Sequence, residues 1–148
     1  MKLFYAIDLF VLELLPVEDI REVALHAIES GFDSPSLYHL ADSQNTDSET
    51  TKRLFCKALN ELRISMPSPA EAGLSVARRI AHDIIQNTIT PYEGAKRIWR
   101  DIYTRFPELV ELRGFVGFAS EYEDDVKHQD DYACLIVKEC KCFLKKYN

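Results

Sequence analysis

Proline positions constrain the fold of this chain more than any other feature of its sequence. Pro35, Pro69 and Pro91 each follow a serine or a threonine, and each opens a segment with apolar residues at helical spacing. This order suits a helix start, because the hydroxyl can cap free backbone N–H groups and proline lacks the N–H that a first turn leaves unpaired. No segment shows the sustained alternation typical of a strand. The pattern therefore predicts an all-α fold.

The apolar spacing predicts a compact bundle of seven to eight short helices joined by short loops. Their approximate ranges are 2–14, 16–30, 34–41, 47–62, 68–87, 90–106, 107–123 and 130–147, with the polar run 42–47 as a loop. The segment 107–123 is apolar almost all round, so we expect one central buried helix there, with Gly114 and Gly117 permitting close approach of a neighbour. The predicted core includes Trp99, Phe115, Val116, Ile84, Ala81 and Ile136.

The size and composition of the chain predict a single helical domain over residues 1–148. The hydrophobic fraction of 47% and the charged fraction of 28% are those of an ordinary globular protein. Near the N-terminus, Lys2 precedes an apolar run, but Asp8 and Glu13 interrupt it and no small-residue cleavage site follows. The run is also too short and too charged to span a bilayer. We therefore expect a cytoplasmic protein that does not enter the membrane.

The four cysteines are Cys56, Cys134, Cys140 and Cys142. Without a secretory signal they are expected to be reduced thiols that pack as small hydrophobic groups. Cys140 falls on the apolar stripe of the last predicted helix. We therefore expect no structural disulfide.

The net charge of the chain is −6 and is unevenly distributed. Acidic side chains number 24 and basic ones 18, and residues 1–40 alone carry −5. An acidic surface repels phosphate backbones and favours basic protein surfaces. The charge therefore counts against nucleic acid and favours a basic protein surface as the partner.

The densest functional signal is the stretch EYEDDVKHQDDYACLIVKECKC, residues 121–142. It places six carboxylates within eleven residues: Glu121, Glu123, Asp124, Asp125, Asp130 and Asp131. Asp130 and Asp131 suit the positive end of the last helix, and the others fit an exposed helix end and loop. Their number exceeds what this structural role requires, since only Lys127 and a protonated His128 offset their repulsion. The six residues are therefore the predicted partner-binding site.

The same stretch lacks the spacing of a metal site. Cys140 and Cys142 are two residues apart, so they point in roughly opposite directions on a helix. The chain has no CxxC pair, and the HxD element at His128 and Asp130 lacks a partner cluster. The acidic run also departs from the calcium-loop pattern. We therefore expect no metal and no cofactor.

Two other motifs are weaker. His82-Asp83 matches the His-Asp dipeptide of helical metal phosphohydrolases, but helical spacing directs His82 away from the apolar stripe. Residues 34–59 can be drawn as a helix-turn-helix that presents Thr50, Thr51, Lys52 and Arg53. Its turn, however, is long and lacks glycine, and its acidic residues would face the phosphates.

The sequence contains no phosphate-binding glycine loop and no GxSxG motif, and it assigns no catalytic residue. We therefore predict a non-catalytic, acidic helical protein-interaction module, such as an inhibitor, an immunity-type protein or an adaptor. The alternative is a helical metal-dependent hydrolase whose carboxylates and histidines converge only in space. A helix-turn-helix DNA-binding regulator follows as the third hypothesis.

Overall fold

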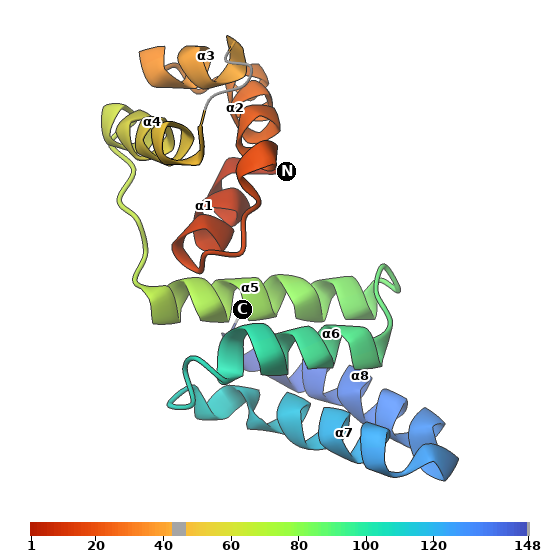
Figure 1. The fold of residues 1–148 in the computed structure, drawn as a ribbon. Helices are drawn as coiled ribbons and strands as arrows, with labels where there is room; N and C mark the ends of the chain where they lie inside the picture. Colours follow the sequence, from red (N-terminus) through yellow and green to blue (C-terminus); the bar gives the residue numbers. More distant parts are fainter. Residues whose placement is uncertain (43–46, 148) are drawn as a thin grey trace. The chain divides into compact units, whose positions relative to one another are not determined.

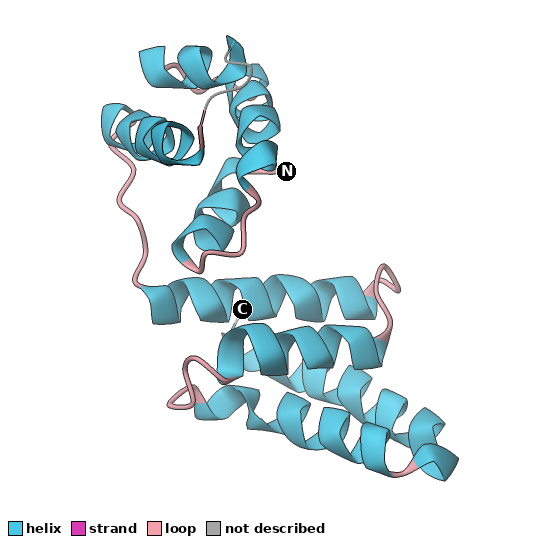
Figure 2. Ribbon diagram, viewed as in Figure 1, coloured by secondary structure: helices cyan, strands magenta, loops and turns pink. Residues whose placement is uncertain are grey.

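The fold was described from a computed structural model, which places residues 1–42 and 47–147. Within these ranges the chain forms eight α-helices, α1 to α8, and no strand (Figures 1 and 2). The prediction of an all-α helical bundle is confirmed. The chain divides into two compact units, Met1–Ala72 and Gly73–Asn148. The single domain over residues 1–148 stays a prediction, because two compact units can still unfold together.

The first unit contains four helices: α1 (Leu3–Val11), α2 (Ile20–Glu29), α3 (Pro35–Asp42) and α4 (Ser48–Glu61). A 3₁₀ turn, η1 (Val17–Asp19), leads into α2. Helix α3 packs against both α2 and α4. The core of this unit includes Phe55, which is fully buried and meets Phe10 edge to face with ring centroids 4.9 Å apart.

The second unit contains the longer helices α5 (Pro69–Ile85), which begins at the end of the first unit, and α8 (Gln129–Tyr147). Between them lie α6 (Pro91–Arg97), the π-helical segment η2 (Ile98–Tyr103), the 3₁₀ turn η3 (Val110–Leu112), α7 (Arg113–Asp124) and the 3₁₀ turn η4 (Val126–His128). Helix α7 packs against α6 and α8. Arg78 of α5 donates from Nη1 to the Tyr147 carbonyl at 2.8 Å, which satisfies a carbonyl at the end of α8.

The proline pattern marks the helix starts as predicted. Pro35, Pro69 and Pro91 are the first residues of α3, α5 and α6. The hydroxyl oxygens of the residues before them accept backbone N–H groups three residues later, at 3.3 Å for Ser34 and Thr90 and 3.2 Å for Ser68. Asp47 caps α4 in the same way. In the predicted loop 42–47, Asp42 ends α3, and residues 43–46 lie outside the described residues.

The predicted core residues Phe115, Ala81, Ile84 and Ile136 are buried, whereas Trp99 and Val116 are only half-buried. The exposure of Trp99 follows from the π-helical segment η2. A π turn is wider than an α turn, so it changes which residues share the inner face. Ile98 and Ile102 fill the core, and the Trp99 ring turns outward, where the Arg100 guanidinium lies 5.6 Å from its centroid.

The predicted helix 107–123 is corrected in two respects. The α-helix begins at Arg113, after the turn η3. It is also amphipathic rather than buried all round: Phe115 and Ala119 are buried, while Val110 before it is 53% exposed. Helices α6 and α8 and the segment η2 cover only part of the α7 surface, so Val116 and Phe118 stay half-buried.

Candidate functional site: the acidic corner

The six predicted site residues lie where α7 ends and α8 begins, and we call this set the acidic corner: Glu121, Glu123, Asp124, Asp125, Asp130 and Asp131. The first four belong to the last turn of α7 and its end, and the other two to the first turn of α8. Asp125 is half-buried and the other five are exposed. The short turn η4 reverses the chain, so the end of α7 and the start of α8 lie at one end of the second unit (Figure 1).

His128 and Asp125 form the centre of the corner. His128 Nδ1 lies 2.9 Å from Asp125 Oδ2 and 3.0 Å from Oδ1. This hydrogen bond, together with the Asp125 charge, raises the pKa of His128, and Asp131 adds to the effect. The same contact lowers the pKa of Asp125. The pair therefore stabilises the η4 turn most when His128 is protonated and Asp125 is ionised.

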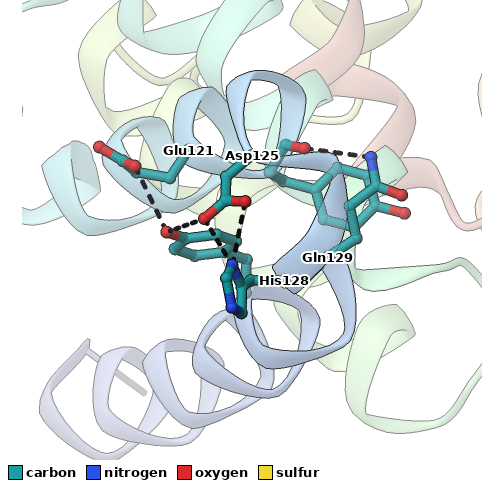
Figure 3. A network of polar contacts seen from close by, with 6 residues as sticks. Glu121, Asp125, His128 and Gln129 are labelled. Carbon is teal, nitrogen blue, oxygen red and sulfur yellow. Dashed lines mark hydrogen bonds and ion pairs between the residues drawn. The ribbon is translucent and has the colours of Figure 1, made fainter.

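Tyr132 and Gln129 of α8 form hydrogen bonds to residues at the end of α7. The Tyr132 hydroxyl lies 3.3 Å from Asp125 Oδ2 and 3.4 Å from Glu121 Oε2, so it joins two carboxylates of the corner. Its pKa is raised by burial and by the charges of these two residues. Gln129 Nε2 donates to the Tyr122 carbonyl at 3.1 Å, which satisfies a backbone group at the end of α7. Glu121 and Asp125 thus share the Tyr132 hydroxyl between them (Figure 3).

Glu123 faces a different neighbour. Its Oε1 accepts from the Tyr92 hydroxyl at 2.7 Å and from Arg100 Nη2 at 3.1 Å, so it ties α7 to α6 and η2. The Tyr92 ring stacks on that of Tyr122, with centroids 4.4 Å apart and planes 13° from parallel. The hydrogen bond to Glu123 raises the pKa of Tyr92. Glu123 is therefore a structural anchor, in contrast to the expectation that Lys127 and His128 alone offset the corner's charge.

Three members of the corner are unpaired: Asp124, Asp130 and Asp131. Their side chains make no hydrogen bond and no ion pair with any residue in the ranges 1–42 and 47–147, although the charge of Asp131 acts on His128. The structure thus brings Glu121, Asp125 and Asp131 around His128 and Tyr132, sends Glu123 toward α6, and leaves Asp124 and Asp130 facing solvent. Arg100 and Tyr92 were missed by sequence analysis, because they lie 23 and 31 residues from Glu123 with no spacing signal to link them.

The cysteines and histidines do not extend the corner into a metal centre. All four cysteines are free thiols, and burial raises the pKa of Cys140 to about 12. Among the described residues, no three His, Cys, Asp or Glu side chains lie close enough together to hold a metal ion. His82, from the His-Asp dipeptide, is exposed on α5.

On the proposed recognition helix of the helix-turn-helix hypothesis, Lys52 and Arg53 are exposed, whereas the two threonines are engaged within the protein. Thr51 is buried, and its hydroxyl donates to the Asp47 carbonyl. The Thr50 hydroxyl donates to the Asp47 carboxylate at 2.8 Å. Both threonines therefore serve the start of α4.

None of the described helices has the length and apolar character needed to cross a membrane. No family model, no curated protein and no solved structure matches this chain.

Proposed function

We propose that this protein is a non-catalytic interaction module whose acidic corner binds a basic surface of a partner protein. The observation that carries the proposal is that some carboxylates of the corner are held by neighbouring side chains while others are unpaired. Glu123 and Asp125 are held by cations and tyrosine hydroxyls, whereas Asp124 and Asp130 are exposed and unpaired within the described residues. Anchored neighbours fix the helix ends that display the unpaired carboxylates, so less conformational entropy is lost on binding.

The charge distribution of the second unit supports the same proposal. Residues 73–148 carry twelve basic and twelve acidic side chains, and so have no net charge. Residues 121–131 nevertheless contain six acidic side chains against one lysine, Lys127. The negative potential at the corner therefore arises from charge segregation rather than from net charge. Such a patch acts chiefly on the rate of encounter with a positively charged partner.

The test is a set of substitutions that removes charge without removing an anchor. The corner variant combines Glu121→Gln, Asp124→Asn and Asp130→Asn, and it leaves Glu123, Asp125 and Asp131 in place. The matched control combines Glu18→Gln, Glu22→Gln and Glu29→Gln, three exposed residues of the first unit, and changes the net charge equally. Both variants and the wild type serve as bait in pull-downs from native lysate at low and high salt.

We expect wild type and control to recover the same basic partner, and the corner variant to recover less of it. The difference should be largest at low salt, because screening weakens exposed charges. Equal recovery by the corner variant and the control would contradict the proposal, and so would a recovered partner whose binding does not depend on salt. Circular dichroism checks that the corner variant keeps its helices.

A further inference from the structure

Helix α8 has a second, outward face that the fold does not use. Its inner face buries Ile136, Cys140, Phe143 and Leu144. The opposite face carries exposed residues at spacings of three and four, namely Asp131, Cys134, Leu135, Lys138 and Lys141. Together with Val137 they line a shallow open groove. Leu135 is 36% exposed and, with Cys134, forms the apolar centre of this face.

Two charges near the centre of this outer face complement each other in an antiparallel pair. Asp131 lies three positions before Cys134, and Lys138 lies three positions after Leu135. If the helix is turned end for end about the point between Cys134 and Leu135, Asp131 and Lys138 exchange positions, while Lys141 falls on the position of His128, which precedes α8. An antiparallel copy of α8 therefore sets two Asp131–Lys138 pairs on either side of a small apolar centre. A parallel copy sets aspartate against aspartate and lysine against lysine.

We propose that the outer face of α8 binds the same face of a second copy of this chain in an antiparallel pair. Such an isologous contact needs only one self-complementary patch, which is how most homodimers form. The patch has one large apolar side chain, so its area falls below that of stable interfaces, and the dimer should be weak and concentration-dependent. The inference shares Asp131 with the acidic corner but does not rest on the proposed function, because the corner variant leaves Asp131 in place and dimerisation is measured without a partner.

The first test uses the native cysteines as distance reporters. At a rise of 1.5 Å per residue, the two Cys134 side chains meet close to the two-fold axis, whereas the two Cys142 side chains lie about 22 Å apart along the paired helices. A bismaleimide with a short spacer should therefore link wild-type chains into dimers. The link should persist in Cys142→Ser and disappear in Cys134→Ser. Linking that is lost in Cys142→Ser instead would overturn the antiparallel arrangement.

The second test is a charge exchange followed by sedimentation equilibrium. Asp131→Lys and Lys138→Asp each replace two attractive pairs in the dimer by two repulsive ones, and each should weaken association about tenfold. The double variant Asp131→Lys/Lys138→Asp should restore it, since the pairs are re-formed with opposite sign. Asp130→Lys, in the same first turn of α8, controls for the effect of a lysine on the helix start. Failure of the double variant to recover dimerisation, or a wild type that is monomeric at all concentrations, would overturn the proposal.

Discussion

The first unit carries twelve acidic and six basic side chains, and the second carries twelve of each. Half of the acidic side chains of the second unit nevertheless lie in the acidic corner. The two units also use their carboxylate networks differently. In the first unit, Glu61 at the end of α4 accepts three hydrogen bonds from the start of α3: from Ser34 Oγ at 2.6 Å, Ser36 Oγ at 2.8 Å and the Ser36 N–H at 3.0 Å. In the second, four donor groups, from Tyr92, Arg100, His128 and Tyr132, are divided among Glu121, Glu123 and Asp125.

This difference shows that the burial of the donors determines whether a surface carboxylate is held within the fold or is available to a partner. Ser34 and Ser36 are buried, with 1% and 4% of their surface exposed, and they would be left unsatisfied without Glu61. Glu61 is therefore committed to joining α3 and α4, and these hydrogen bonds lower its pKa. The donors of the acidic corner are the exposed cations Arg100 and His128 and the half-buried tyrosines Tyr92 and Tyr132, none of which is as deeply buried as the two serines. Carboxylates of the corner are thus available to a partner in a way that Glu61 is not.

The largest expected effect tests whether the units are separate bodies. Phe55→Ala in the first unit and Phe115→Ala in the second each remove a fully buried ring and should lower the free energy of unfolding by about 3–5 kcal/mol. The ring contacts of Phe55 and Phe115, with Phe10 and Phe143, lie within their own units. We therefore expect hydrogen exchange measured by mass spectrometry to rise mainly in the unit that carries the substitution. An equal rise throughout both units would instead support a single domain over residues 1–148.

The second prediction compares the two networks directly. Ser34→Ala removes a buried hydroxyl that donates to Glu61 and accepts from the Leu37 N–H, and it should cost about 1–3 kcal/mol of unfolding free energy. Tyr132→Phe removes a half-buried hydroxyl that makes two long contacts, and its effect should be smaller. Urea denaturation of both variants measures the difference. A larger loss for Tyr132→Phe would show that the corner is structural rather than available for binding.

Sequence analysis succeeded where the determinants are local. The helix starts at Pro35, Pro69 and Pro91 depend on a cap and a proline that are adjacent in the chain, and the inner face of α8 depends on apolar spacing alone. Contacts between helices could not be predicted in this way, because they depend on how the helices pack and not on neighbouring positions in the chain. Ser34 meets Glu61 across 27 residues, and Arg100 meets Glu123 across 23. Because no spacing in the sequence links Arg100 to Glu123, the anchoring of Glu123 could not be predicted.

The two glycines of α7 illustrate the same limit, and they supply a third prediction. A Cβ added at Gly114 would lie 2.5 Å from the Glu139 carboxyl carbon on α8, so this glycine does allow close approach. Gly117 is exposed and has no atom within 4 Å of such a Cβ. Gly117→Ala should therefore stabilise the second unit by up to about 1 kcal/mol, because alanine favours the helix. Gly114→Ala should stabilise the second unit less than Gly117→Ala, or should destabilise it, since Glu139 must move. Thermal unfolding of both variants measures which of the two is more stable.

The smallest expected effects concern the pH dependence of stability. The Glu61 network and the acidic corner should differ in whether they lose stability as pH rises. The pKa of Glu61 is lowered in the folded protein, so its contribution is present above its ordinary value and is lost only as pH falls through the lowered pKa. Asp125 behaves in the same way. The pKa of His128 is raised, so its contribution is complete below about pH 6.5 and is lost as pH rises through the raised pKa. The corner should therefore weaken at both ends of the pH range, and the Glu61 network at the acid end alone.

Difference curves isolate these contributions from the rest of the chain. The melting temperature of wild type minus that of His128→Gln should be constant between about pH 5 and pH 6.5 and should shrink above that range, as the imidazolium that Asp125 favours loses its proton. The corresponding difference for Glu61→Gln should stay constant from about pH 5 upward and shrink only in acid, because Ser34 and Ser36 do not titrate there. A His128→Gln difference that persists unchanged to pH 9 would mean that the neutral imidazole holds the η4 turn equally well. In that case the charge of His128 contributes nothing to the stability of the corner. Lys127 is then the one cation on η4 that offsets the repulsion among the carboxylates of the corner.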